Sequence, residues 1–432
     1  MSKNSRIENI EADLSKSDSQ GHNISLCIKQ GNKPNQQDSG FVGILPNFDK
    51  QKNAEEILRE AIKKTESNHK ECLKGTTICS AIISNQSIVV ANLGDSRAAG
   101  IFKVKGFFGD RFISVLFSQD HDFSVQRVRK YVKERGGIIS PDKGIDVVNK
   151  KLEMGGAIGD LSVIEEGKKD CLIRNPDILS FDLESLCKKI GIKKSDVIDL
   201  DLMVSCDGLW NLKNGKMKCD FEVDVKENGE QELKNKASYF SKFSFRKNLS
   251  DIKKSYNSYL KKIGSEKEIE SFANFACQYA LKNGSRDNVS VAHLTYFKNE
   301  QLNDLLAPNQ KIIATICDGH GMGKEYSKED SVSEIDKKGW GGGNVSNSVS
   351  ADVYVSCGVI ELPGCEIDPK KQGFLYELIA LRGSKTNVES FAIDDEQLDK
   401  NLKVFADDKK PSFSPVLKDM ESQSSSIKAK QI

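Results

Sequence analysis

The chain has 432 residues, of which 38% are hydrophobic and 29% are charged, so it carries enough apolar material for a sizeable core. Its 64 Lys and Arg residues almost match its 63 Asp and Glu residues, which excludes a global charge favouring nucleic acid or an acidic membrane. No stretch approaches 18 consecutive apolar residues, so no transmembrane segment is expected.

The eleven cysteines are scattered singly, without any CxxC pair, and their number is odd. This pattern is neither a zinc-ribbon spacing nor a disulfide framework, so we interpret them as reduced thiols. The N-terminal residues also lack the apolar stretch of a secretion signal. We therefore expect a cytoplasmic protein, with the nucleus as the alternative location.

The predicted elements are mostly short strands, with a few helices between them. Residues 1–20 are polar, and we expect a flexible N-terminal arm there. From Ile24 onward, closely spaced β-like runs are separated by Gly, Asn, Asp or Ser, which favours antiparallel pairing over a βαβ array. Apolar residues at helical spacing predict helices over 54–70, 125–137 and 268–285. The expected fold class is α+β, a two-sheet antiparallel β-sandwich flanked by α-helices.

Residues 213–264 form a basic insertion. Between 234 and 262, many Lys and Arg residues are interleaved with aromatic ones. Two interpretations stay open: a docking surface for acidic proteins, anionic lipid or nucleic acid, or a solvated helical insertion whose aromatic rings pack onto the body. Residues 364–432 are polar, and we expect a mostly disordered tail.

Four acidic sites share one pattern, in which a short apolar strand lies next to an Asp that is followed by a turn or loop residue. They are Asp318 in KIIATICDGHG, Asp207 in DLMVSCDGLW, Asp287 in GSRDNVSVAHL and Asp38 in KPNQQDSGF. A strand end holds a carboxylate rigidly, and Mg²⁺ and Mn²⁺ prefer such oxygen ligands. One Asp-Gly pair is typical of a simple turn, but four such sites together, one followed by His320, predict a metal centre.

These segments resemble the metal-dependent type 2C serine/threonine protein phosphatases. The matching motifs extend from KPNQQDS at 33–39 to ICDGHG at 316–321, and the combination of GDSR, DG, DN and DGHG is highly specific. The resemblance implies a β-sandwich with flanking helices, two Mn²⁺ or Mg²⁺ ions with a weaker third, and phosphoserine or phosphothreonine proteins as substrates. It implies attack on phosphorus by a metal-bridged hydroxide. No specific nucleic-acid partner is expected.

Position by position, the resemblance implies the metal ligands. Asp318 would bridge both ions, and the carbonyl of Gly319 would bind one of them. Asp207 and Asp287 would hold the other ion. These three carboxylates supply the hard oxygen donors that such ions require.

The remaining roles also follow from the resemblance. Gln37 would contact an ion through water, and Asp38 would support the ligands. Asp120 would serve the third ion. Lys33 would bind phosphate, and His320 would protonate the leaving oxygen, a role suited to its near-neutral pKa. His121 is interpreted instead as a structural histidine.

The order of the motifs departs from the family. In the family, the DGHG strand directly follows the NQD strand, whereas here it comes after DNVSV. The segment 309–363, a strand and a helix, therefore looks relocated within a phosphatase-like domain at 21–363. Three explanations stay open: the segment completes the site of its own chain, two chains exchange it, or the sequence is a gene-model or splicing artefact. Gly156 and Asn211 also replace an expected Arg and an expected Asp.

Three other functions compete with the phosphatase interpretation. An inactive pseudophosphatase that binds phosphoproteins is the main alternative, because the DGHG strand is displaced. A nucleotide-binding enzyme is excluded by spacing, since Asp318 stands at the first glycine of the phosphate-loop pattern and Glu325 follows its lysine. A different binuclear hydrolase is disfavoured, because such enzymes commonly use His-rich ligand sets and only one of the five histidines stands beside an Asp-Gly pair.

Overall fold

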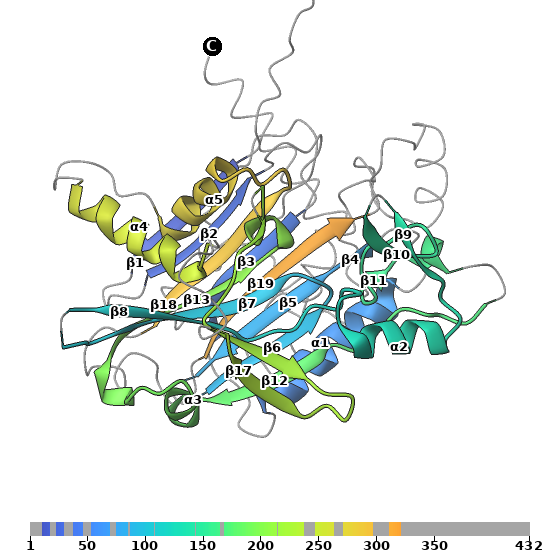
Figure 1. The fold of residues 1–432 in the computed structure, drawn as a ribbon, viewed down its shortest axis with the longest axis horizontal. Helices are drawn as coiled ribbons and strands as arrows, with labels where there is room; N and C mark the ends of the chain where they lie inside the picture. The colour runs from blue at the N-terminus through green and yellow to red at the C-terminus, as the bar shows by residue number, and fades with distance from the viewer. Residues whose placement is uncertain are drawn as a thin grey trace, which may run out of the picture.

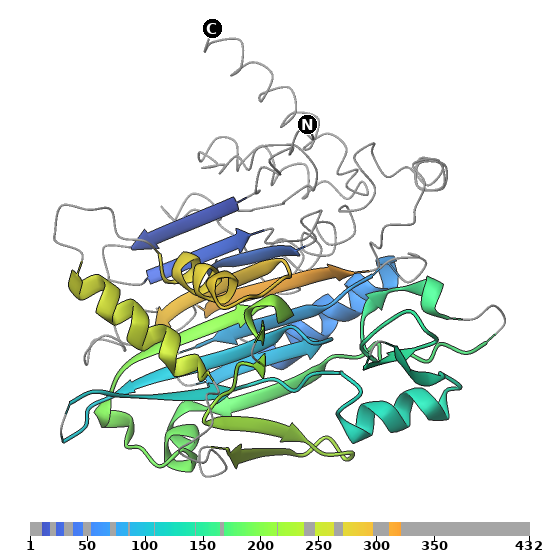
Figure 2. The same cartoon turned by 45° about the horizontal axis from the view of Figure 1, so that its top comes forward.

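Two large sheets packed face to face form the centre of the molecule, and helices cover their outer faces (Figures 1 and 2). This computed structural model describes residues 11–17, 23–29, 38–45, 53–69, 75–84, 87–107, 109–142, 144–164, 168–213, 215–236, 247–262, 271–296 and 311–320. The expected α+β sandwich flanked by helices is confirmed.

The first sheet has eight strands. Their order is β1 (Glu11–Ser17), β2 (Asn23–Lys29), β18 (Val289–Tyr296), β13 (Val197–Ser205), β7 (Arg97–Val104), β8 (Arg111–Leu116), β16 (Phe221–Val225) and β17 (Gln231–Asn235). All neighbours in this sheet are antiparallel except β8 and β16, which run parallel.

The second sheet contains the strand that the sequence indicates as relocated. Its strands are, in order, β11 (Ile158–Gly159), β4 (Gly75–Thr76), β19 (Lys311–His320), β5 (Ile78–Ile83), β6 (Ser87–Leu93) and β12 (Asp177–Asp182), and β3 (Asp38–Leu45) also pairs with β19. Strand β19 lies between β3 and β5, antiparallel to both, with Ala314 opposite Val42 on one side and Ala81 on the other. In this structure, a strand of the same chain therefore occupies that central position.

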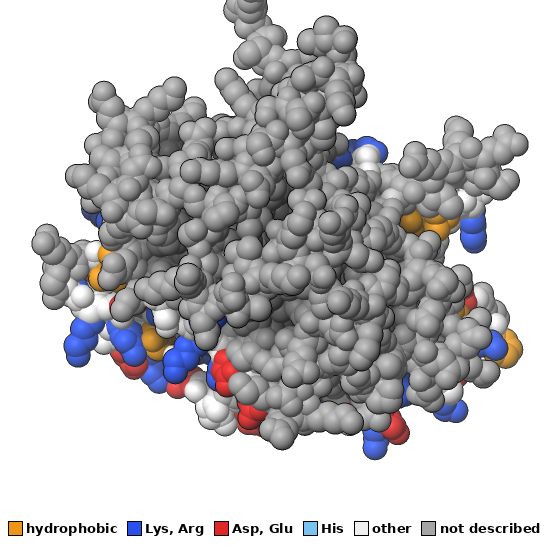
Figure 3. All heavy atoms as spheres, turned by 180° about the vertical axis from the view of Figure 1, so that it is seen from behind, with side chains coloured by type: hydrophobic (Ala, Val, Ile, Leu, Met, Phe, Trp, Pro, Cys, Tyr) orange, Lys and Arg blue, Asp and Glu red, His pale blue; other side chains and the backbone are white. Residues whose placement is uncertain are grey.

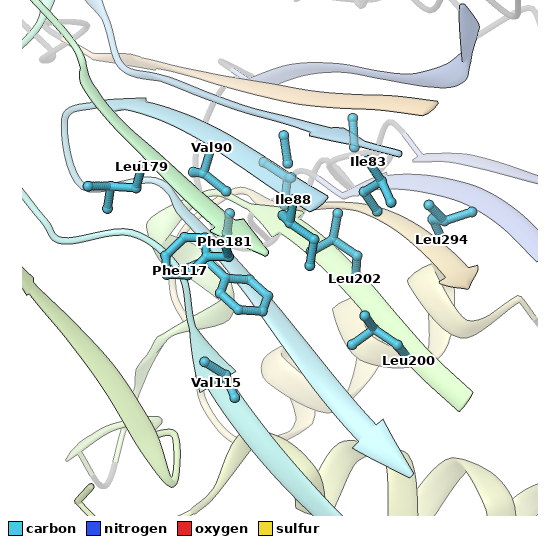
Figure 4. Close-up of a cluster of buried hydrophobic side chains, with 14 of the residues drawn as sticks. Ile83, Ile88, Val90, Val115, Phe117, Leu179, Phe181, Leu200, Leu202 and Leu294 are labelled. Atoms are coloured by element: carbon cyan, nitrogen blue, oxygen red, sulfur yellow. The ribbon is translucent and has the colours of Figure 1, made fainter. Parts of the chain in front are cut away.

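The core between the sheets is made of apolar side chains from both inner faces. Val115, Leu200 and Leu294 project from the first sheet, and Ile88 and Phe181 project from the second (Figure 4). The rings of Phe117 and Phe181 lie 5.0 Å apart between centroids. Such burial of apolar area is the main stabilising contribution to a sandwich of this kind.

All three predicted helices are confirmed, as α1 (Ala54–His69), α2 (Gln126–Glu134) and α5 (Phe272–Lys282). The apolar stripes of α1 and α2, including Ile57, Ile62 and Val128, are buried in a cluster that also contains side chains of the second sheet. Helix α5 packs on β18 and β2 of the first sheet and begins at Ser271, whose side chain accepts a hydrogen bond from the backbone N–H of Asn274.

The remaining elements complete the described chain. They are α3 (Leu183–Lys189), α4 (Leu249–Lys262), the 3₁₀ helices η1 (Leu161–Val163), η2 (Lys194–Asp196) and η3 (Asp207–Leu209), and the two-stranded sheets β9 (Ile139–Asp142) with β10 (Ile145–Val148) and β14 (Asn211–Leu212) with β15 (Gly215–Lys216). No helix in the described ranges is long and apolar enough to cross a membrane. On the face drawn in Figure 3, the described side chains that reach the surface are mostly charged, with both signs interspersed.

The structure differs from the sequence-based expectation for the N-terminal arm. Residues 11–17, expected to be flexible, form β1 and pair with β2 from Glu11 opposite Lys29 to Ser17 opposite Asn23. An edge strand is held by backbone hydrogen bonds to one neighbour, so a polar sequence suffices to form it.

The basic insertion is partly β-structure. The hairpin β16–β17 extends the first sheet, and α4 follows it. The Tyr256 ring lies 5.1 Å from Phe272, and the Tyr259 ring lies 5.5 Å from Phe275, between centroids. These contacts favour the interpretation in which aromatic residues pack onto the body. Residues 237–246, the predicted helix after DGHG and the predicted polar tail lie outside the described residues.

Candidate metal centre

One end of the sandwich gathers carboxylates from both sheets. Asp38 begins β3 and lies directly opposite Asp318 of β19 in the antiparallel register. Asp207 follows the end of β13, and Asp287 precedes the start of β18. Because Ser205 of β13 pairs with Val291 of β18, the end of one strand lies beside the start of the other. The four acidic sites predicted from the sequence are thus delivered by adjoining strand ends.

The most compact part of this end is formed by Asp38, Cys206 and Asp318. One potential ligand atom from each of the three lies within 4.8 Å of the other two. Asp38 is only 1% exposed, and Asp318 is half-buried. The Cys206 thiol is itself held in place, because it donates to the carbonyl of Asn288 at 3.4 Å and accepts from the Ser290 backbone N–H at 3.1 Å.

The electrostatics of this cluster favour a bound cation. Desolvation raises the pKa of Asp318 well above its ordinary value, and the carboxylates of Asp38, Asp207 and Asp287 raise it further. Burial raises the pKa of Asp38 to about 7, although hydrogen bonds from Cys206 and Ser290 oppose the shift. In the described part of the chain, the neighbours that act most strongly on Asp318 are all acidic. A divalent cation would offset that repulsion and match the oxygen donors, so the residues fit Mn²⁺ or Mg²⁺.

A close backbone approach holds Asp207 and Asp287 together. At Gly208, an added Cβ would lie 1.8 Å from the carbonyl oxygen of Asn288, so only glycine fits there. The Ser285 hydroxyl also donates to the Gly208 carbonyl at 2.7 Å. The glycine of the Asp-Gly motif is therefore required by packing against the Asp-Asn motif, and this packing places the two carboxylates at the same edge.

The backbone around Asp318 is fixed by its neighbours in the second sheet. The Thr77 N–H donates to the Asp318 carbonyl at 2.9 Å, and the Asp318 N–H donates to the Thr77 hydroxyl at 3.3 Å. Gly319 and His320 pair with Thr76 and Gly75 of β4. The side chain of His320 lies outside the described residues, as do Lys33 and Gln37, so their assigned roles stay predictions.

Asp120 is engaged in a different contact. The Arg97 Nε donates to its Oδ1 at 2.7 Å, and Arg97 Nη2 contacts its Oδ2. The Arg97 guanidinium also lies over the Trp210 ring, 5.0 Å from its centroid. A bidentate pair of this kind engages both carboxylate oxygens, so binding of a third ion by Asp120 stays a prediction.

Two departures from the family pattern have structural partners. Asn211 donates from Nδ2 to the Asp207 carboxylate at 2.8 Å. Gly156 lies against His121, because an added Cβ would come within 2.5 Å of His121 Nδ1. The His121 ring is buried, accepts from the Gly94 N–H at 3.3 Å and lies 3.0 Å from the Asp177 carboxylate, which fits the structural role expected for it.

Two residues of the centre were missed by reasoning from the sequence. Cys206 directly precedes Asp207, and Thr77 lies in the segment GTTICSA at 75–81, which starts the strand run next to β19. Their contribution depends on contacts across strands, between Cys206 and Asp38 and between Thr77 and Asp318. Proximity in the chain alone does not indicate such contacts.

Comparison with known proteins identifies the family. The family model described as "Protein phosphatase 2C" matches residues 31–289, which is more than half of the chain. The chain therefore belongs to the protein phosphatase 2C family. The match ends before β19, so the DGHG segment lies outside the matched range.

Curated relatives match over a shorter part. The chain is 30% identical over 149 residues to "Probable protein phosphatase 2C 58" of Oryza sativa subsp. japonica, covering 34% of each chain. It is 31% identical over 156 residues to "Protein phosphatase 1L" of Bos taurus, covering 36% of each. The chain thus spans about a third of the length of these relatives. The solved serine-threonine phosphatase 2C from Toxoplasma gondii is 12% identical, with 66% of this chain and 98% of that chain covered, at a TM-score of 0.39, which supports no further conclusion.

Proposed function

We propose that this chain is a metal-dependent phosphatase that hydrolyses phosphoserine and phosphothreonine in proteins. The observation that carries the proposal is the meeting of Asp38, Asp318, Asp207 and Asp287 at one end of the sandwich, where the carboxylates raise the pKa of Asp318. Membership of the protein phosphatase 2C family supports the activity.

The proposed ligands divide between the two sheets. Asp318 and the Gly319 carbonyl belong to β19, whereas Asp207 and Asp287 come from loops next to β13 and β18. Two Mn²⁺ or Mg²⁺ ions, when bound, would activate water and neutralise the charge of the phosphoryl oxygens. Gln37 would contribute through water.

The protein's own residues would position the ligands and the substrate. Asp38 faces Asp318 in the strand register, and the hydrogen bonds of Thr77 hold the Asp318 backbone still. Such preorganisation is needed because ligands misplaced by about 1 Å lose much of the catalytic effect. Lys33 would bind the phosphate, and His320 would give its proton to the departing serine or threonine oxygen.

The test is Mn²⁺-dependent phosphate release from a phosphothreonine peptide by the intact chain, Asp318→Asn and Asp142→Asn. Asp142 is an exposed carboxylate of the β9–β10 hairpin and serves as the matched control. We expect chelator-sensitive turnover that falls about a thousandfold in Asp318→Asn and is unchanged in Asp142→Asn. A folded intact chain that binds Mn²⁺ in calorimetry without releasing phosphate would instead indicate a phosphoprotein-binding pseudophosphatase.

A further inference from the structure

Exposed cationic side chains lie on the segments next to Asp207 and Asp287, the two carboxylates of the first sheet. We call them the cationic rim, and its members are Lys213, Lys216, Lys282 and Arg286. Lys213 and Lys216 follow the Asp-Gly pair after β13, and Lys282, the last residue of α5, and Arg286 precede the Asp-Asn pair before β18. All four lie outside the aromatic-rich basic segment at 234–262.

Backbone contacts join these two loops into one surface. The Lys213 N–H donates to the Asn283 carbonyl at 3.3 Å. An added Cβ at Gly284 would lie 2.6 Å from the Lys213 Cβ, so Lys213 lies directly over Gly284. Lys216 pairs with Asn211 in the β14–β15 ladder, and the Asn211 side chain donates to Asp207. The rim is therefore continuous with the proposed metal ligands.

Most of the rim side chains form no ion pair with a described carboxylate. Among the described residues, only Lys216 of the four has an ion-pair partner, Asp122, at 3.4 Å. Some other exposed lysines do have an ion pair, as Lys130 has with Glu227 at 2.7 Å. The chain as a whole has a formal net charge of only +1, so selection by charge would depend on local groups such as these.

We propose that the cationic rim binds acidic side chains that flank the phosphorylated residue of a protein substrate, so that the protein selects phosphorylated segments rich in Asp and Glu. The proposal rests on the proposed phosphatase function. Complementary charges beside a reaction site speed productive encounter and disfavour partners of the wrong sign. A substrate whose phosphate reaches the carboxylate end would place its neighbouring residues over the two loops that carry the rim.

The experiment compares two phosphothreonine peptides that differ only in flanking Asp or flanking Lys residues. The rim variant is Lys213→Glu with Lys282→Glu, which leaves the proposed ligands and their sequence neighbours untouched. The control is Lys193→Glu with Lys194→Glu, since these exposed lysines precede β13 at the end opposite Asp207. At low salt, we expect kcat/KM of the intact chain to favour the acidic peptide about tenfold. That preference should vanish or reverse in the rim variant, persist in the control, and shrink as salt is raised.

Two results would overturn the proposal. An unchanged preference in the rim variant would show that the rim does not contact the flanking residues. An equal loss on both peptides, with weaker Mn²⁺ binding in calorimetry, would show that the rim only offsets the charge of the carboxylates.

A failure of the proposed function is distinguishable from a failure of the rim. If the intact chain releases no phosphate, binding of fluorescent versions of the two peptides is measured by anisotropy. Tighter binding of the acidic peptide by the intact chain than by the rim variant would support the rim, and equal binding by both would refute it.

Discussion

Two groups of buried carboxylates in this molecule have opposite surroundings. Asp201 of β13 is fully buried, and the Lys253 Nζ lies 2.7 Å from its Oδ2, while His293 Nε2 and the Thr295 hydroxyl lie 3.0 and 2.9 Å from its Oδ1. Burial alone would raise the pKa of Asp201, but Lys253 and His293 hold it well below its usual range. At the carboxylate end, Asp38 is equally buried, yet its pKa is raised to about 7 by burial.

The difference separates a carboxylate whose charge the protein itself neutralises from the carboxylates proposed to bind metal. The protein supplies the cation and hydrogen-bond donors that Asp201 needs, so that group joins α4 to the first sheet. At the other group, the strongest neighbours of Asp318 are acidic, so folding leaves a charge imbalance for a ligand to correct. Clusters of like charges that destabilise the folded state are found most often at functional sites.

The largest effect on stability should come from Asp201→Asn. This change leaves the buried Lys253 ammonium without its counter-charge, so the free energy of unfolding should fall by about 3–5 kcal/mol. Urea denaturation measures the loss. Asp199→Asn is the control, because Asp199 lies two residues away on β13 in a looser 3.8 Å pair with Lys103 and should cost less than about 1 kcal/mol. Equal losses in both variants would show that Asp201 stabilises the fold no more than a looser ion pair does.

A smaller effect of opposite sign is expected for Asp318→Asn in the metal-free chain. Removing one of the mutually repelling carboxylates should raise the free energy of unfolding by roughly 1–2 kcal/mol, measured in urea with a chelator present. Added Mn²⁺ should then stabilise the intact chain and have little effect on the variant. A variant less stable than the intact chain without metal would show that Asp318 is not electrostatically strained.

The smallest effect concerns Glu66 of α1, whose surroundings are intermediate between those of Asp201 and those of Asp318. Burial raises the pKa of Glu66 to about 7, although Arg174 lies 3.5 Å away and the Gly159 N–H donates to it at 3.3 Å. Because the folded chain holds this proton more tightly than the unfolded chain, the free energy of unfolding should fall as pH rises from about 4.5 to about 7. Solvent screening limits this contribution to roughly 1 kcal/mol.

The measurement is the urea midpoint of the metal-free chain across that pH range. Glu66→Gln should make the decline shallower, because Asp38, whose pKa is also raised to about 7, contributes to the same decline. Glu60→Gln, an exposed position on the same helix, should leave it unchanged. An undiminished decline in Glu66→Gln would assign the pH dependence to other groups.

Much of the fold was predictable because its signals are local. The apolar stripes of α1, α2 and α5 give the helical period, and the Asp residues at strand ends indicate one metal-binding edge. Strand β1 was not predictable, because its pairing with β2 depends on backbone hydrogen bonds rather than on a pattern of side chains.

The polar network around Asp201 was equally hidden in the sequence. Lys253 and His293 are separated from Asp201 by 52 and 92 residues, and His293 lies six residues beyond Asp287, where nothing in the sequence indicates a contact with Asp201. The contact between Cys206 and Asp38 likewise arises only when β3 and the end of β13 come together. Contacts of this kind follow from tertiary packing, which periodicity does not encode.

The position of β19 between β3 and β5 has a consequence for biosynthesis. The hydroxyls of Ser80 and Thr315, on β5 and β19, lie 2.9 Å apart although 235 residues separate them. At ordinary translation speeds, β3 and β5 leave the ribosome roughly 10–50 s before the strand that lies between them. During that interval, the edges of β3 and β5 that pair with β19 have no partner strand and are open to mispairing. The carboxylate cluster is completed only after translation has passed Asp318.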